Sequence, residues 1–353
     1  MVPKIILALF LLGLLSCNTE LSENENNDKV DLSNTQSIKF QHPTYMQNFK
    51  MGDSISVEYS TVSEKVADSS VIYLNNVSQG KVIGTGIVHL NSNHTGMQTI
   101  TVKVYYKDTV VSGSTVVSCY SDIKPVQYAY KVLNKYKHSP DDYTQGLQYD
   151  NGFIYEGTGQ KGESVLKKYK LSDSELIQSY QLPSEDFGEG IVLFKNYIYQ
   201  LTWQSGIAYK YEKETFKLLN RFVVQTEGWG ITTYENNLIM SDGSNVLYEL
   251  SPESFDVVRR IEVYDNIGPV GQLNELENVG GKIFANVYTT NFIVIIDPKT
   301  GRVEGKINLE GLLKQADNPK DAEVLNGIAW KGEDKKLLVT GKWWPNIFYI
   351  EYY

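Results

Sequence analysis

Residues 144–155 read TQGLQYDNGFIY, and the same arrangement returns four more times towards the C-terminus. In each copy a short apolar strand leads into a polar or glycine turn, and a second apolar strand follows. The copies begin at Gln145-Gly146-Leu147, Glu189-Gly190-Ile191, Trp229-Gly230-Ile231, Asn274-Glu275-Leu276 and Asn326-Gly327-Ile328. The second strands recur at intervals typical of propeller blades built from four strands each, starting at Phe153, Tyr197, Leu238, Ile283 and Leu337.

The number of copies predicts the architecture. Residues 124–353 number 230, which gives roughly 46 residues for each of five copies. We therefore expect an all-β fold in which a five-bladed β-propeller fills residues 124–353. A strand near Ala129-Tyr130-Lys131-Val132 is expected to complete the last blade, so that no sheet edge at the closure stays free.

The repeat also predicts where a site would lie. The innermost strands of a propeller run along its central channel, so equivalent strand ends face the same mouth. A carboxylate, a lysine, several carboxamides and aromatic rings share this register, whereas channel packing alone favours small apolar residues. Any one of them alone is more often a turn or cap residue, but their common register predicts a functional mouth. The positions are Gln145, Glu189, Trp229, Asn274 and Asn326 on the first strands, and Gly159, Trp203, Ser244, Tyr288 and Lys342 after the second strands.

The preceding residues, 37–123, alternate between apolar and polar side chains at the period of two that strands require. Several short strands within about 85 residues predict a small immunoglobulin-like β-sandwich. We expect a spacer or protein-contact module here, with Cys119 as an inert buried thiol. The expected strands include 54–59, 71–74, 99–106 and 110–117.

The first 36 residues are expected to be a targeting segment and a tether. Lys4 precedes an apolar run at 5–12, and Leu14-Leu15-Ser16-Cys17 resembles a bacterial lipobox. This pattern predicts a signal peptide at 1–16 and lipidation of Cys17, which would hold the chain on a bacterial membrane facing the periplasm or the exterior. An ordinary secretory signal with an unrelated cysteine is the alternative. Residues 17–36 are polar and acidic, as a flexible tether would be.

Composition excludes several function classes. The chain has 33 Lys and Arg against 42 Asp and Glu, a net charge of −9, which argues against a nucleic-acid partner. Two cysteines exclude a disulfide framework, and all four histidines precede Ser139. A histidine triad or histidine-bound metal formed by residues 139–353 alone is therefore excluded. We expect no cofactor, no metal site and a monomer.

Taken in order, the motifs resemble one known family, the plant-type glutaminyl-peptide cyclotransferases of the papaya-enzyme type and their bacterial relatives. The likeness spans about residues 126–353, and the number of separate motifs makes it specific. The motifs are His138-Ser139-Pro140-Asp141-Asp142-Tyr143-Thr144-Gln145-Gly146-Leu147, Phe187-Gly188-Glu189-Gly190, Leu201-Thr202-Trp203, Glu227-Gly228-Trp229-Gly230, Asp242-Gly243-Ser244, Asn274-Glu275-Leu276-Glu277, Leu325-Asn326-Gly327-Ile328-Ala329 and Gly341-Lys342-Trp343-Trp344-Pro345.

The resemblance implies a five-bladed propeller that converts N-terminal glutamine of peptides or proteins into pyroglutamate and releases ammonia without a catalytic metal. It also implies that Glu189 is the catalytic glutamate. One position departs from the family, because Tyr288 stands where the family's tryptophan is expected. The residues before 126 lie outside the resemblance.

The chemistry assigns further roles. The α-amine of the substrate attacks its own γ-carboxamide, so a single carboxyl group can accept the amine proton and pass it to ammonia. Glu189 is expected to do this, with Lys342 and Asn274 as donors to the developing oxyanion. The alternatives are a structural carboxylate for Glu189 and an ion-pair partner of Glu189 for Lys342. The residues expected to bind substrate are Gln145, Phe187, Trp203, Trp229, Tyr288 and Asn326.

Two other functions remain open, because propellers serve many purposes. One is a non-catalytic propeller that binds a peptide or a glycan at the same mouth. The other is a structural module whose N-terminal sandwich docks a partner. A pure binder needs no proton shuttle beside an oxyanion donor, so Glu189 with Lys342 and Asn274 favours the enzyme.

Overall fold

The structure is a computed structural model that describes residues 38–62, 66–82, 85–89 and 93–353. The signal peptide, the lipidation at Cys17 and the tether at 17–36 lie outside the described residues, so they stay predictions. The described chain belongs to one compact unit, Ser37–Tyr353. It consists of strands and one short 3-10 helix, η2 (Leu313–Gln315). Among these residues, no helix has the length and apolar character needed to cross a bilayer.

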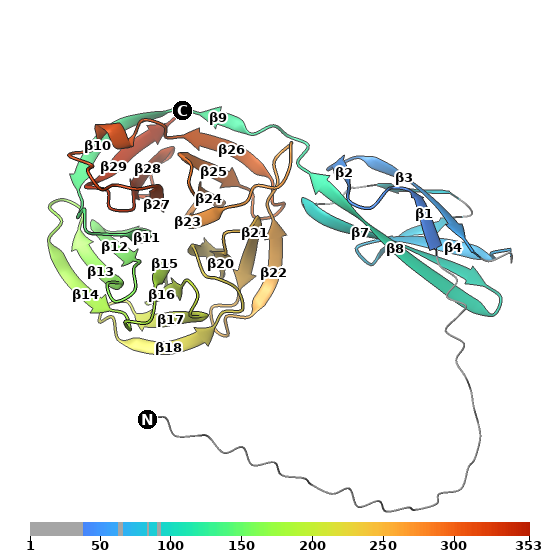
Figure 1. The fold of residues 1–353 in the computed structure, drawn as a ribbon, viewed down its shortest axis with the longest axis horizontal. Helices are drawn as coiled ribbons and strands as arrows, with labels where there is room; N and C mark the ends of the chain where they lie inside the picture. Colours follow the sequence, from blue (N-terminus) through green and yellow to red (C-terminus); the bar gives the residue numbers. More distant parts are fainter. Residues whose placement is uncertain (1–37, 63–65, 83–84, 90–92) are drawn as a thin grey trace, which may run out of the picture. The chain divides into compact units, whose positions relative to one another are not determined.

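The first eight strands form two sheets (Figure 1). One sheet has the order β1-β3-β6, and the other has the order β2-β8-β7-β4-β5. Ile55, Val57, Ile100 and Val102 belong to the apolar cluster between the strands of this region, and Cys119 is buried in it. The strands are β1 (Ile38–His42), β2 (Gln47–Lys50), β3 (Ser54–Thr61), β4 (Ser69–Leu74), β5 (Val77–Val82), β6 (Gly86–His89), β7 (Gly96–Tyr106) and β8 (Thr109–Tyr120).

The remaining strands form five sheets, antiparallel except where β9 joins the fourth, that follow one another around a ring (Figure 1). Three of them use consecutive strands: β11 (Thr144–Asp150), β12 (Phe153–Thr158), β13 (Val165–Lys170) and β14 (Leu176–Gln181); β15 (Gly188–Phe194), β16 (Tyr197–Thr202), β17 (Ile207–Glu212) and β18 (Leu218–Val223); and β19 (Ile231–Tyr234), β20 (Asn237–Ser241), β21 (Val246–Leu250) and β22 (Val257–Glu262).

The last two sheets borrow strands from the start of the ring. The fourth sheet contains β23 (Leu273–Val279), β24 (Lys282–Val287), β25 (Phe292–Ile296) and β26 (Val303–Asn308), and β9 (Val126–Tyr128) joins it in parallel to β26. The fifth contains β27 (Leu325–Ala329), β28 (Lys336–Gly341) and β29 (Asn346–Tyr352), with β10 (Tyr130–Lys137) paired to β29. The expected closing strand near Ala129–Val132 is therefore confirmed.

Period-two alternation builds the core between neighbouring sheets. In β12, Ile154 packs towards the fifth sheet, and the next residue, Tyr155, packs towards the second sheet. Five apolar clusters lie between the five pairs of neighbouring sheets. The inner strands β11, β15, β19, β23 and β27 each contact the next, and β27 contacts β11, so the ring is closed.

Glycines allow the inner strands to crowd together. A Cβ on Gly146 would lie 2.3 Å from the backbone N of Ile191. A Cβ on Gly230 would lie 2.0 Å from the backbone O of Asn274. No side chain fits at such distances, so the repeated glycine fixes how closely adjacent inner strands approach.

Replacing Gly230 by alanine tests this constraint. Because the clash is with backbone that cannot rotate away, Gly230→Ala is expected to lower the free energy of unfolding by about 2–3 kcal/mol. Gly271→Ala is the matched control, since its nearest neighbouring atom would be 3.8 Å away. Denaturant unfolding of both variants measures the difference, and equal stabilities would contradict the crowding explanation.

Candidate functional site

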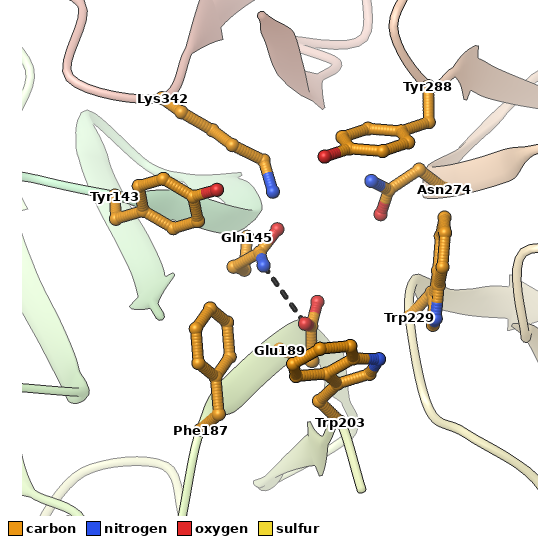
Figure 2. Close-up of a pocket in the computed structure, with 9 residues that line it drawn as sticks. All are labelled: Tyr143, Gln145, Phe187, Glu189, Trp203, Trp229, Asn274, Tyr288 and Lys342. Carbon is orange, nitrogen blue, oxygen red and sulfur yellow. Dashed lines mark hydrogen bonds between the residues drawn. The ribbon is translucent and has the colours of Figure 1, made fainter. Parts of the chain in front are cut away.

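A pocket of about 210 Å³ opens where the inner strands begin (Figure 2). That volume lies below the usual range of about 300–1,000 Å³ for small-molecule sites, so it suits one side chain and its first bonds rather than a large ligand. The lining residues come from all five sheets or the connections beside them: Tyr143, Gln145, Phe187, Glu189, Trp203, Trp229, Asn274, Tyr288 and Lys342.

Strand register explains why residues so far apart in sequence meet. Gln145, Glu189 and Asn274 each occupy the second position of an inner strand, in β11, β15 and β23. Trp203 and Lys342 directly follow the second strands of their sheets, β16 and β28. Because neighbouring strands are antiparallel, the start of an inner strand and the end of the second strand lie at the same end of the ring.

Two carboxamides form a hydrogen-bonded chain that ends at Glu189. The side-chain amide of Gln145 donates to Glu189 Oε1 at 2.9 Å, and Asn326 Nδ2 donates to Gln145 Oε1 at 3.0 Å. This chain fixes the orientation of Gln145. Among the described residues, Glu189 Oε2 accepts no hydrogen bond, so one carboxyl oxygen is free to act on a bound molecule (Figure 2).

Burial changes the acid–base properties of Glu189. The residue is only 5% exposed, and this desolvation raises the pKa of its carboxyl group well above the usual value. The nearby Lys342 ammonium group opposes the rise, and Glu227 adds to it. A carboxylate whose pKa is raised binds a proton more readily than an ordinary glutamate, which suits acid–base catalysis.

Lys342 faces the same space from the opposite side (Figure 2). Its Nζ lies 4.4 Å from the ring centre of Tyr143 and 5.3 Å from that of Tyr288, within cation–π range. Burial lowers the pKa of Lys342, and the charges of Glu189 and Glu323 oppose this effect. Among the described residues, Lys342 has no ion pair within 4.0 Å. Its N–H donors point into the pocket and are not bonded to a carboxylate (Figure 2).

Aromatic rings form the walls of the pocket and pack against one another edge to face. Phe187 packs against Trp203 with ring centres 5.6 Å apart, and Trp229 packs against Tyr288 at 5.5 Å. A single oxygen of Glu227, Oε2, accepts from both indole N–H groups, at 2.8 Å from Trp203 and 3.0 Å from Trp229. The carboxylate therefore sets the position of two walls at once.

Asn274 completes the lining with a polar group that has no protein partner. It is 3% exposed, and within the described chain its Oδ1 has no hydrogen bond. A buried acceptor without a partner costs about 1–3 kcal/mol, which a bound N–H group would recover. The pocket is thus shaped for a ligand that brings a hydrogen-bond donor.

The structure brings together eight of the nine residues expected to be catalytic or to bind substrate. Asn326 is the ninth, and it is fully buried behind Gln145, with Nδ2 also bonded to the backbone O of Thr144. It positions Gln145 instead of lining the pocket. Tyr143 lines the pocket but was not predicted, although it closely precedes Gln145 in the first motif. Its contact with Lys342 joins the first sheet of the ring to the last, which no local pattern reveals.

Two further buried carboxyl groups, Glu275 and Glu277, lie on the inner strand β23. Glu275 accepts from the backbone N of Leu147 through Oε1 and of Ile328 through Oε2. Burial raises the pKa of Glu275 well above normal and that of Glu277 to about 8. Both oxygens of Glu275 are thus used to tie inner strands together. Glu275 therefore has the kind of structural role that was the alternative for Glu189.

His138, Asp142 and Glu156 form a cluster whose candidate ligand atoms lie within 4.8 Å of one another. The Nδ1 of His138 bonds the backbone O of Trp344 at 2.6 Å, and its Nε2 lies 3.1 Å from both oxygens of Glu156. Lys167 pairs with Asp142. Burial opposes a charged imidazole, but Glu156 and Asp142 raise the pKa of His138 above normal. His138 and Lys167 thus already contact the oxygens of Glu156 and Asp142, and a metal ion would have to displace them.

This charged network holds the two segments that carry Tyr143 and Lys342. Besides the His138–Trp344 bond, the backbone N of Trp343 donates to the backbone O of Asp142 at 2.7 Å. Histidine therefore has a structural place beside the pocket and does not line it.

The closed ring of sheets defines a propeller-like fold, and it holds a buried carboxyl group and a lysine in a small aromatic pocket. Comparison with known proteins agrees. A family model described as glutamine cyclotransferase matches residues 107–352.

Two individual proteins are similar over the same region. The glutaminyl-peptide cyclotransferase of Arabidopsis thaliana is 34% identical over 227 residues, which cover 63% of this chain and 70% of the plant protein. The crystal structure of Myxococcus xanthus glutaminyl cyclase matches with a TM-score of 0.59 and 30% identity, covering 65% of this chain and 98% of that one. The chain belongs to the glutamine cyclotransferase family.

Glu227 offers a test of how the walls are positioned. Glu227→Ala removes the acceptor of both indole N–H groups and is expected to raise KM about tenfold, since each bond to a charged group contributes about 1.5–3 kcal/mol. Glu227→Gln keeps an acceptor oxygen and should recover most of the affinity. Steady-state kinetics together with tryptophan fluorescence report both effects. If the two variants behave alike, Glu227 does not act through its hydrogen bonds.

Proposed function

We propose that the protein is a glutaminyl-peptide cyclotransferase, which converts the N-terminal glutamine of peptides or proteins into pyroglutamate and releases ammonia. The observation that carries the proposal is the free Oε2 of buried Glu189, opposite Lys342, in a pocket of side-chain size. Membership of the glutamine cyclotransferase family supports the same reaction.

The first task of the site is to fold the substrate onto itself. The reaction is intramolecular, so holding the α-amine close to the γ-carboxamide carbon supplies much of the rate. Trp203, Trp229, Phe187 and Tyr288 provide flat walls for the methylene groups of the glutamine side chain. Asn274 also lines the pocket, and its side-chain amide can donate to the carbonyl oxygen of the substrate.

Glu189 then moves the proton. The α-amine nitrogen forms a bond to the γ-carboxamide carbon, and one of its protons passes to Glu189. Collapse of the tetrahedral species breaks the bond to the carboxamide nitrogen, which leaves as ammonia with the proton returned by Glu189. No proton is gained or lost overall. Gln145 keeps Oε1 occupied, so the transfers use Oε2.

Lys342 stabilises the charge that develops between these two transfers. The carbonyl oxygen becomes an oxyanion in the tetrahedral species, and a preorganised ammonium donor in a water-poor pocket lowers the energy of that state. The aromatic rings of Tyr143 and Tyr288 keep Nζ in place without neutralising it. A non-catalytic peptide or glycan binder would have no need to bury this pair of groups together.

Further proposals concern the rest of the chain. The five sheets support a five-bladed β-propeller at 124–353, and the two sheets of β1–β8 support an immunoglobulin-like sandwich at 37–123. The sequence Leu14-Leu15-Ser16-Cys17 supports a lipid anchor in a bacterial cell envelope. Substrates would then be exported chains whose processing exposes an N-terminal glutamine. All the pocket residues belong to a single chain, which is consistent with a protein that acts as a monomer.

Replacing Glu189 by glutamine tests the proton shuttle. Glu189→Gln keeps the shape and the bond with Gln145 but cannot carry the proton, so kcat for ammonia release from a Gln-Ala-Ala peptide should fall by about 100-fold or more, with KM little changed. The thermal midpoint shows whether the variant is folded. Near-normal turnover by a folded Glu189→Gln protein would remove Glu189 from the mechanism.

A second prediction concerns pH. Lys342 lowers the pKa of Glu189, so Lys342→Met should raise that pKa and shift the rising limb of kcat against pH to higher pH. The same variant should lose about 100-fold in kcat, because the oxyanion donor is gone. Lys342→Arg keeps the positive charge, so the rising limb of its kcat against pH is expected at the same pH as in the unchanged protein. An unchanged limb in Lys342→Met would show that the two groups are not coupled.

A further inference from the structure

Charge is unevenly distributed between the two ends of the ring. Ten connections lie at the pocket end, and they hold twelve Asp and Glu against four Lys and Arg, a net charge of −8. The nine connections at the opposite end hold nine acidic and seven basic residues, a net charge of −2. The pocket-end connections are 138–143, 159–164, 182–187, 203–206, 224–230, 242–245, 263–272, 288–291, 309–324 and 342–345.

This asymmetry is not a consequence of overall composition. The whole chain has 42 acidic residues for 33 basic ones, and the opposite end of the ring is close to that proportion. Three of the twelve pocket-end carboxylates, Asp142, Asp265 and Asp317, are neutralised by lysines within the protein. The other nine have no ion pair among the described residues; Asp186 is buried and accepts from the Tyr209 hydroxyl, and exposed members include Asp141, Glu185 and Asp321.

Three of the carboxylates without an ion pair, Glu323, Glu227 and Glu185, lie beside residues of the pocket. Glu323 accepts from the Tyr143 hydroxyl at 3.5 Å, and Glu227 holds both indoles of the wall. Glu185 is exposed shortly before Phe187, which lines the pocket. The mouth therefore has acidic groups on more than one side, and the buried Lys342 is the one basic residue in the lining.

A substrate with a free N-terminus brings a positive charge to this face. An α-amino group has a pKa of about 7.7–8.0 and is largely protonated at neutral pH, so a field of negative sign draws it towards the mouth. The residues that follow the glutamine remain outside a pocket of about 210 Å³ and lie over the acidic connections. Lysine or arginine there would be attracted, and aspartate or glutamate would be repelled.

Resting on the proposed cyclotransferase activity, we infer that this face selects its substrates by charge. The substrate class is peptides and proteins whose N-terminal glutamine is followed by basic or neutral residues. Chains with acidic residues directly after the glutamine are poor substrates. The selection acts mainly on association, since exposed charges steer encounter more than they strengthen the final complex.

The experiment compares Gln-Lys-Lys, Gln-Ala-Ala and Gln-Glu-Glu amides through the rate of ammonia release. At about 20 mM ionic strength, kcat/KM is expected to be about tenfold higher for the lysine peptide than for the glutamate peptide, and the ratio should fall to about twofold at roughly 300 mM, where screening acts within about 6 Å. Gln-Ala-Ala carries only its α-ammonium charge, so its kcat/KM should fall less on adding salt than that of the lysine peptide.

Two triple variants with the same change in net charge provide the control. The first triple variant neutralises three exposed carboxylates at the pocket end, by Asp141→Asn, Glu185→Gln and Asp321→Asn. It should lower the ratio of kcat/KM between the lysine and glutamate peptides about threefold at low salt. It leaves Glu227 and Glu323, which contact the pocket walls, unchanged. The second triple variant neutralises three exposed carboxylates at the opposite end, by Glu235→Gln, Glu253→Gln and Asp256→Asn. It should leave the ratio of kcat/KM unchanged. Turnover of Gln-Ala-Ala should be similar in both.

The outcomes separate this inference from the proposed function. If Gln-Ala-Ala is cyclised but the two charged peptides react equally, or if both triple variants change the ratio equally, selection by the pocket-end face is overturned and the cyclotransferase activity stands. If none of the three peptides releases ammonia, the proposed function fails, and the inference that rests on it fails with it.

Discussion

The structure depends on how closely the inner strands approach one another at the axis of the ring. At Gly146, Gly190 and Gly230 a single added carbon would lie within 2.0 to 2.7 Å of backbone atoms in the next strand. Such contacts set the diameter of the ring at the level of the pocket. Because Gln145, Glu189 and Trp229 each directly precede one of these glycines, the same constraint that closes the ring also brings the site residues to its axis.

Three buried glutamates show that the environment, more than residue type, decides a role. Burial raises the pKa of Glu189, Glu275 and Glu277 alike. Glu275 uses both oxygens to accept from backbone N–H groups of two other inner strands, so its carboxyl group is a structural tie. Glu189 is bonded through one oxygen only, and the other opens into the pocket. The difference lies in which N–H groups surround each side chain, and it is the basis on which we propose Glu189, and not Glu275, for proton transfer.

The aromatic walls determine the shape of the pocket, whereas Lys342 and the acidic connections determine its charge. The edge-to-face contacts of the aromatic walls, with Glu227 bonded to two indoles, hold a pocket shaped for a small uncharged side chain. Lys342 is kept inside it by rings rather than by a carboxylate, so its charge remains available to a developing oxyanion. Around this pocket the connections are acidic, which suits a substrate that arrives with a free ammonium group.

The sequence by itself determined the repeated strand pairs, the closing strand near Ala129–Val132 and eight of the nine expected site residues, because strand register and glycine spacing are local patterns that recur along the chain. Only the tertiary structure decided that Asn326 lies behind Gln145, that Tyr143 reaches Lys342, and that Glu275 ties strands while Glu189 faces the pocket. These distinctions depend on which atoms meet across the axis after the ring closes. The partners come from different sheets of the ring, and the linear order of residues contains no record of the distance or direction between them.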